Sequence, residues 1–296
     1  MHEVYLCLDV GGTEIKAAPL DANGKMLSKI QYFPAMACAD KKTLLEHFAH
    51  IFTSICPADK VPIEIDLAFP GPFDYENGIC LLQGLEKYDA LYGCNLRHAF
   101  AALSGLPQKR IQFINDAAAF ALGELTFGSS RQAHKTLFTV IGTGCGSAFG
   151  VDGFLAAKGT LGVPPHGYFY SAPFMDSCVD DYISRRGLEK LTKDLLGTPL
   201  DGRALAARVA AGDTQAASCF LQFGVLLRDA LSPQIEAFNP DMICLGGQIM
   251  RSAPLFLSPL EALCNEKNIK LSVTQDTSMR TMQGLTRANS RYNGDR

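Results

Sequence analysis

The sequence predicts an α/β fold with two domains and a duplicated core, in which a β-hairpin is followed by βαβ units. Three observations support this prediction. A strand pattern, a glycine-rich turn and a hairpin pattern occur together at residues 4–32 and again at residues 136–157. After each copy, helical and strand patterns alternate, as is typical of crossovers between parallel strands. The length of 296 residues is sufficient for two modest domains with separate cores.

The composition is that of an ordinary globular protein, because 47% of the residues are hydrophobic and 19% are charged. The net charge of −3 gives no basic footprint, so we expect no nucleic-acid partner. The apolar run at residues 4–8 is too short for a signal peptide or a membrane span. We therefore expect a cytoplasmic protein without a membrane partner. The ten cysteines include no C-x-x-C pair, and we expect reduced thiols.

The first half of the chain alternates strands, helices and one long loop. Strand patterns cover residues 4–9, 15–20, 26–32, 63–69 and 111–115. Apolar residues on one helical face predict a helix over residues 44–55, and good helix formers predict another over 117–127. The segment from Pro70 to Asn95 lacks periodicity and is rich in Gly, Asp, Asn and Tyr, which favours a long functional loop.

The second half repeats the opening pattern and then becomes helical. A strand pattern precedes the glycine turn at residues 142–146, and a hairpin pattern follows it. Long helical patterns cover residues 178–196 and 216–238. A last strand at 242–245 leads into a third glycine turn at residues 246–247.

The three glycine turns are candidates for nucleotide binding, because glycine lets backbone N–H groups surround phosphate oxygens. The candidate residues are Gly11, Gly12, Thr13 and Lys16, then Gly142, Thr143, Gly144 and Gly146, then Gly246 and Gly247. Asp9 is expected to hold Mg²⁺ through a water or a phosphate. The alternatives are a tight hairpin turn at the first site and a ligand-free turn before a helix at the third. Neither a dinucleotide fingerprint nor a P-loop motif is present.

Asn115 and Asp116 lie where a strand pattern changes to a helical pattern, a favoured place for chemistry. Phosphoryl transfer to an alcohol needs a carboxylate that accepts the hydroxyl proton, and Asp116 is our candidate for this general base. The alternative is that Asp116 only caps the helix. Asn115 is a candidate for binding a substrate hydroxyl, or else it only forms the turn.

Five segments together resemble the ROK family of repressors, open reading frames and kinases. They are LDVGGTEIKAAPLD, LAFPGPFDYENG, INDAAAFALGE, VIGTGCGSAF and PDMICLGGQI. In this order they are similar to the family's first phosphate loop, Pro-Gly-Pro segment, catalytic Asn-Asp segment, second phosphate loop and adenosine loop. The resemblance implies an actin-like ATPase (ribonuclease H-like) fold with an interdomain cleft.

The resemblance also implies a glucokinase-like sugar kinase that uses ATP and Mg²⁺. Such an enzyme transfers the γ-phosphoryl group to a hydroxyl of a hexose or an N-acyl hexosamine. Asp116 then corresponds to the catalytic base, and Asn115 and Gly71 to sugar-binding positions. We expect a domain at residues 1–117, rejoined by a C-terminal helix at about 281–296, and a larger domain at 118–280. A homodimer is expected from the resemblance alone.

The sequence departs from the family in the zinc-binding segment, which is G-E-x-G-H followed by C-x-C-G-x-x-G-C-x-E in relatives. Here it is GTLGVPPHGYFYSAPFMDSCVDDYISRRGL. Only Cys178 matches a ligand, and one thiol cannot hold a tetrahedral zinc, so we expect no structural zinc. Asp180 stands at the position of the family glutamate, His166 is a candidate for the family histidine, and the resemblance makes both candidates for sugar binding. Gln83 replaces the asparagine of the sugar loop and keeps an amide.

Two other functions remain open. One is a non-catalytic sugar or nucleotide sensor with the same fold, because fold alone does not determine function. The other is a glucokinase that uses polyphosphate as its donor. A carboxylate at residue 116 favours an enzyme, because a sensor needs no base. We expect no repressor role, because Asp9 leaves no room for a preceding DNA-binding segment.

Overall fold

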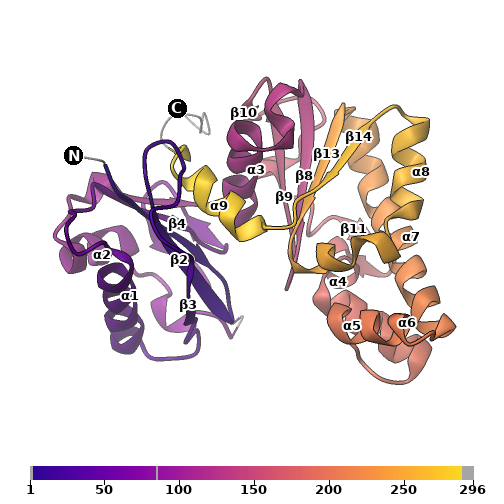
Figure 1. The fold of residues 1–296 in the computed structure, drawn as a ribbon, viewed down its shortest axis with the longest axis horizontal. Coiled ribbons are helices and arrows are strands. Elements are labelled where there is room, and N and C mark those ends of the chain that lie inside the picture. The colour runs from indigo at the N-terminus through magenta and orange to yellow at the C-terminus, as the bar shows by residue number, and fades with distance from the viewer. Residues whose placement is uncertain (1–2, 85, 289–296) are drawn as a thin grey trace. The chain divides into compact units, whose positions relative to one another are not determined.

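The computed structural model describes residues 3–84 and 86–288, and these form two compact units (Figure 1). Unit 1 contains the described residues up to Phe127 and those from Ser278 onward, whereas unit 2 runs from Gly128 to Thr277. Each unit contains one five-stranded mixed sheet. The two sheets have the same plan, in which an antiparallel meander is extended by two parallel strands. The predicted duplication is therefore confirmed.

The sheet of unit 1 has the strand order β3-β2-β1-β4-β7. Its strands are β1 (Tyr5–Val10), β2 (Glu14–Leu20), β3 (Gln31–Pro34), β4 (Glu64–Ala68) and β7 (Ile111–Ile114). Strand β3 begins later than the expected strand at 26–32, because bends and turns occupy most of the chain between β2 and residue 30. In the parallel part, Asp9 pairs with Ala68, which in turn pairs with Ile114. The carboxyl ends of β1, β4 and β7 therefore lie at one edge of the sheet.

Helices α1 (Lys41–Ile55) and α2 (Leu96–Ser104) cover one face of this sheet (Figure 1). Each begins at a capping side chain, because Asp40 accepts the N–H of Thr43 and Asn95 accepts the N–H of His98. The core between them is aromatic. The rings of Phe48 and Phe100, for example, lie 4.9 Å apart between centroids.

Helices α3 (Asp116–Phe127) and α9 (Thr277–Leu285) cross each other at small residues. A Cβ on Gly284 would lie 1.8 Å from the carbonyl oxygen of Ala119, and a Cβ on Gly123 would lie 2.0 Å from that of Arg280. Through this crossing α3 belongs to unit 1, although the sequence assigned residues 118–127 to the second domain. The boundaries near 117 and 280 stay predictions. Residues 289–296 of the expected C-terminal helix lie outside the described residues.

The sheet of unit 2 has the order β10-β9-β8-β13-β14. Its strands are β8 (Lys135–Ile141), β9 (Cys145–Val151), β10 (Phe154–Leu155), β13 (Met242–Gly246) and β14 (Lys270–Val273). Strands β8 and β13 are parallel, with Val140 opposite Gly246. The second and third glycine turns therefore follow neighbouring strands at the same edge.

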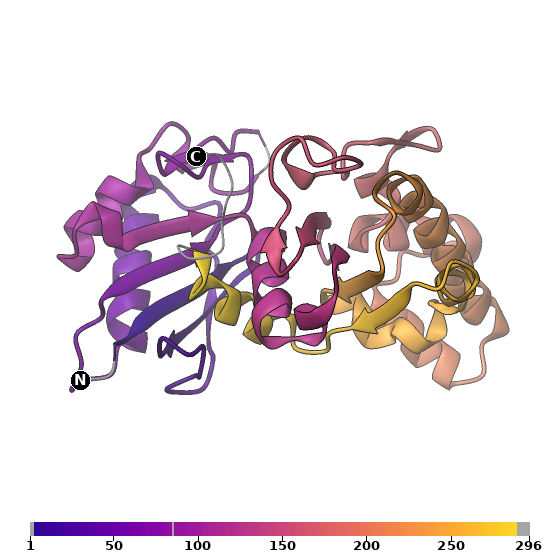
Figure 2. The same ribbon diagram turned by 90° about the horizontal axis from the view of Figure 1, so that it is seen from above.

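The helices of unit 2 are α4 (Val179–Tyr182), α5 (Arg185–Leu196), α6 (Gly202–Ala210), α7 (Thr214–Phe238) and α8 (Ser258–Glu266). Figure 2 gives a second view of their arrangement around the sheet. The single helix expected over 178–196 is wrong, because Ser184 starts a new helix by accepting the N–H of Gly187. Helix α7 is the core helix, with Phe220 and Phe223 fully buried against Phe256.

The remaining elements are short. Two-residue strands are β5 (Phe73–Asp74), β6 (Ile79–Cys80), β11 (Pro173–Phe174) and β12 (Ser177–Cys178). The 3₁₀ turns are η1 (Asp89–Leu91), η2 (Gln108–Arg110), η3 (Ser129–Gln132), η4 (Pro165–Gly167) and η5 (Gln248–Leu255). Strands β5 and β6 lie inside the long loop between β4 and α2. Within the described part of the chain, no helix combines the length and apolarity that a membrane crossing requires.

Candidate functional site

The first glycine turn joins β1 to β2 in unit 1. The N–H of Gly11 donates to the carbonyl of Glu14 at 3.0 Å, and a Cβ on Gly11 would lie only 2.8 Å from that oxygen. Glycine is therefore required for this tight closure. The hydroxyl of Tyr88 donates to the carbonyl of Gly11 at 2.8 Å, which fixes the turn from the long loop. Thr13 is exposed next to it.

Asp9 lies near the end of β1, opposite Lys16 on β2. Burial raises the pKa of Asp9, the ammonium of Lys16 and a hydrogen bond with Ser278 lower it, and the nearby carboxylate of Asp116 raises it. Lys16 Nζ also donates to Ser278 Oγ at 2.8 Å. Two carboxylates that repel each other at one sheet edge form an oxygen-rich place suited to Mg²⁺. The expected role of Asp9 in holding Mg²⁺ stays a prediction.

Asn115 and Asp116 stand between β7 and α3 and have different tasks. Asn115 Oδ1 accepts the N–H groups of Ala117 at 3.0 Å and Ala118 at 3.2 Å, so Asn115 is the residue that caps α3. One oxygen of Asp116 accepts the N–H of Ala117 at 2.9 Å. Burial raises the pKa of Asp116, while the N–H of Ala117, the charge of Lys87 and the Asn115 side chain lower it.

The turn after β4 reaches the same edge of the sheet. Tyr75 donates its hydroxyl proton to the carbonyl of Phe69 at 2.9 Å and accepts a hydrogen bond from Asn115 Nδ2 at 3.5 Å. A Cβ on Gly71 would lie 3.4 Å from this hydroxyl oxygen. Gln83 is exposed farther along the loop. The sequence did not point to Tyr75, because nothing distinguishes it from the other tyrosines of the loop.

The second and third glycine turns lie side by side in unit 2. In the second, the N–H of Gly142 donates to the carbonyl of Gly144 at 2.9 Å. In the third, Gly247 has φ 102°, and a Cβ there would lie 2.1 Å from the carbonyl oxygen of Ile141. The N–H of Gly247 donates to Thr277 Oγ1 at 2.7 Å. The close approach of Gly247 to Ile141 holds the two turns together.

Asp180 and His166 occupy different places in unit 2. Asp180 Oδ1 accepts the N–H of Cys145 at 2.6 Å, which places its carboxylate against the second glycine turn. His166 lies exposed in η4, with its ring stacked on Tyr168 at 6.0 Å between centroids. Turn η4 is held on β9, because Ser147 Oγ donates to the carbonyl of Gly167 at 2.7 Å.

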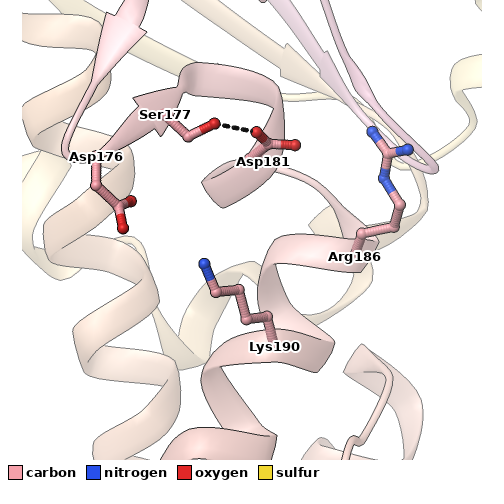
Figure 3. A pocket seen from close by; sticks show the side chains of 5 residues that line it. All are labelled: Asp176, Ser177, Asp181, Arg186 and Lys190. Atoms are coloured by element: carbon pink, nitrogen blue, oxygen red, sulfur yellow. Dashed lines mark hydrogen bonds between the residues drawn. The ribbon is translucent and has the colours of Figure 1, made fainter.

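The segment at the position of the family's zinc motif forms a polar surface pocket of about 320 Å³ (Figure 3). Its lining residues are Asp176, Ser177, Asp181, Arg186 and Lys190. Ser177 and Cys178 both donate to Asp181 Oδ2, the thiol at 3.4 Å. Among the described residues, no group of three or more His, Cys, Asp or Glu side chains could hold a metal ion. The expectation that the protein has no structural zinc stays a prediction.

The structure thus assigns each candidate residue to one unit. Unit 1 contains Asp9, Gly11, Gly12, Thr13, Lys16, Gly71, Gln83, Asn115 and Asp116. Unit 2 contains Gly142, Thr143, Gly144, Gly146, His166, Asp180, Gly246 and Gly247. The sequence did not point to Ser278 or Thr277. Ser278 bonds to Lys16 and Thr277 bonds to Gly247, and in both pairs the two residues lie far apart in the chain.

Comparisons with known proteins find sugar kinases that are similar to this chain. The chain is 25% identical over 283 residues to a glucokinase of Thermotoga maritima, covering 86% of this chain and 84% of that protein. It is 25% identical over 270 residues to an N-acetyl-D-glucosamine kinase of Aliivibrio salmonicida, covering 86% and 87%. A ROK family glucokinase from Streptomyces griseus, solved with glucose and AMPPNP, has a TM-score of 0.74 at 18% identity over 96% of this chain and 98% of that chain.

The structural likeness confirms the predicted two-domain α/β fold of the actin-like ATPase type. The sequence model described as the ROK family matches residues 5–285, a range that contains all five motifs and both sheets. The chain therefore belongs to the ROK family.

Proposed function

We propose that this protein is an ATP-dependent sugar kinase that transfers the γ-phosphoryl group to a hydroxyl of a hexose or an N-acyl hexosamine. The observation that carries the proposal is the position of Asp116. Its partly buried carboxylate lies at the start of α3, at the sheet edge that also carries Asp9 and the first glycine turn. A base must stand next to the phosphate-binding elements if it is to deprotonate an acceptor hydroxyl.

Asp116 suits the role of base because Asn115 performs the capping that would otherwise explain a polar residue there. Burial raises the pKa of Asp116, which makes the carboxylate a better proton acceptor, while Lys87 and the N–H of Ala117 keep it ionisable. Asp116 takes the hydroxyl proton as the acceptor oxygen bonds to the γ-phosphorus and the bond to the leaving ADP oxygen breaks.

The glycine turns provide the donors for the phosphates. We assign the phosphates to the turns at residues 11–13 and 142–146 and the adenosine to Gly246 and Gly247. The N–H groups of Gly11, Gly142 and Cys145 already donate to acceptors within the protein, so the remaining N–H groups of the two turns would contact the phosphate oxygens. Asp9 would hold Mg²⁺ through a water or a phosphate, and the metal would supply positive charge to the transferred group. We assign the sugar contacts to Asn115, Gly71, Gln83 and His166.

Names of relatives support two acceptor classes, because a glucokinase and an N-acetyl-D-glucosamine kinase are similarly close to this chain. Gln83 and His166 are two of the positions at which this chain departs from the family pattern. We therefore expect its choice between acceptors to depend on these two side chains.

The test is a coupled ADP-release assay with Mg-ATP against glucose, mannose, fructose, N-acetylglucosamine and N-acetylmannosamine. A second series replaces ATP by inorganic polyphosphate and measures sugar phosphate directly. We expect sugar-dependent turnover with ATP and at least one of these acceptors. Absence of turnover with every acceptor and both donors, in a protein that binds Mg-ADP, would contradict the proposal and favour the sensor.

A further inference from the structure

The second glycine turn is held at both of its ends by the segment that contains α4 and α5. At one end, the Asp180 carboxylate accepts the N–H of Cys145 at 2.6 Å. At the other end, the N–H of Arg185 donates to the carbonyl of Gly142 at 2.8 Å. The turn that we assign to phosphate binding therefore has a conformation fixed by contacts outside the hairpin itself.

Asp180 is itself tightly fixed. Its N–H donates to the carbonyl of Tyr170 at 2.9 Å, and its side chain is 19% exposed. A Cβ on Gly144 would lie 2.7 Å from Asp180 Oδ1, so the absence of a side chain at Gly144 makes room for this carboxylate. A carboxylate that accepts a backbone N–H is a strong, charge-assisted contact.

Arg186 offsets the negative charge that Asp180 places beside the second glycine turn. A carboxylate beside a phosphate-binding turn would repel the nucleotide, because like charges at short range are unfavourable. The guanidinium of Arg186 forms an ion pair with Asp180 Oδ2 and remains 60% exposed. The pair is thus close to neutral, and Asp180 keeps its hydrogen bond to the turn.

We propose that Asp180 and Arg186 form a clamp that positions the second glycine turn for the nucleotide phosphates. In this role Asp180 is a positioning residue for the nucleotide and does not contact the sugar, in contrast to the role that the family glutamate suggests. The inference rests on the proposed function in assigning the second turn to phosphates. In this role the segment that contains α4 and α5 positions the second glycine turn through hydrogen bonds, and this function requires no zinc.

The experiment compares Asp180→Ala and Asp180→Asn with a matched control, Asp181→Asn. Asp181 is the next carboxylate on α4, but it faces Ser177 and Cys178. Calorimetry measures the Kd of Mg-ADP for each variant, and the ADP-release assay measures the KM of the sugar. We expect Asp180→Ala to weaken Mg-ADP binding about 10- to 100-fold, the range for one lost charge-assisted hydrogen bond. The sugar KM and the Asp181→Asn variant should stay near wild type.

Further measurements distinguish loss of the clamp from misfolding of the variant and from failure of the proposed kinase function. Exchange of the Cys145 amide hydrogen should accelerate in Asp180→Ala, while the amides of β8 stay protected. Arg186→Met should weaken Mg-ADP binding only when Asp180 is present. A raised sugar KM with an unchanged Kd for Mg-ADP would overturn the clamp and return Asp180 to the sugar. Normal Mg-ADP binding by the wild type without turnover would instead contradict the proposed function and leave the clamp testable by binding alone.

Discussion

Gly284→Ala tests whether the crossing of α3 and α9 sets the geometry of the candidate site. The change has two opposing effects. Alanine is favoured over glycine in a helix interior by about 1 kcal/mol. The new methyl carbon, however, would lie 1.8 Å from the carbonyl oxygen of Ala119 and 2.7 Å from the backbone nitrogen of Gly123. Both distances are well inside the roughly 3.5 Å at which non-bonded atoms make favourable contact.

Because both neighbours are backbone atoms, a side-chain rotation cannot relieve the overlap and the helices must separate. Overpacking of this kind costs about 1–3 kcal/mol and occasionally more. Two backbone contacts this close place the cost in the upper part of that range, at about 2–3 kcal/mol, so we expect a net loss of about 1–2 kcal/mol after the gain of about 1 kcal/mol in helix propensity. Turnover should also fall, because α3 carries Asp116 at its start and α9 begins beside Ser278, which bonds to Asp9 and Lys16.

The assay is urea unfolding, followed by the intrinsic fluorescence of the tyrosines, with Gly202→Ala as the matched control. Gly202 is also helical, but the nearest atom to a Cβ there is 3.7 Å away. We expect the midpoint to fall for Gly284→Ala and to stay the same or rise for Gly202→Ala. Equal midpoints for the two variants would refute the reasoning that backbone contact at the crossing decides the outcome.

Two further predictions follow from charges in unit 1. Lys87→Met removes a cation that lowers the pKa of Asp116, so this pKa should rise. The acid limb of the pH profile of kcat/KM should then move to higher pH. An acid limb that does not move would contradict the electrostatic effect of Lys87 on Asp116. Asp66 is buried beside Glu64, and burial raises its pKa well above the ordinary range. The folded state therefore loses stability as pH rises above the unfolded pKa of about 3.9, and the gain in Tm from Asp66→Asn should grow between pH 4 and pH 8; a constant gain would contradict this sign.

The sequence predicts those parts of the fold and site that depend on local pattern. Strand-turn-hairpin patterns identified both copies of the core, since alternation and glycine turns are visible within about 30 residues. The turns at Gly11 and Gly142 follow β1 and β8 as expected. Helix capping by Asn115 was not distinguishable from capping by Asp116, because both side chains can accept the same N–H groups.

Contacts between distant segments could not be predicted. Ser278 reaches Lys16 across 262 positions in the chain, and Thr277 reaches the third turn from the start of α9. The hydrogen bond of Asp180 to the second turn spans 35 positions and depends on the break between α4 and α5. Hydrophobic periodicity predicts one helix there, because α4 and α5 share the same apolar spacing and only the cap at Ser184 separates them.

The most direct test of the central claim is a comparison of wild type with Asp116→Asn, which keeps the size of the side chain and removes its ability to accept a proton. Single-turnover transfer from Mg-ATP to the best acceptor is measured beside the Kd of Mg-ADP, with Glu46→Gln on α1 as an exposed carboxylate control. The account predicts a loss of transfer of about 10²- to 10⁴-fold with the Kd unchanged. Transfer by Asp116→Asn at the wild-type rate would contradict Asp116 as the base.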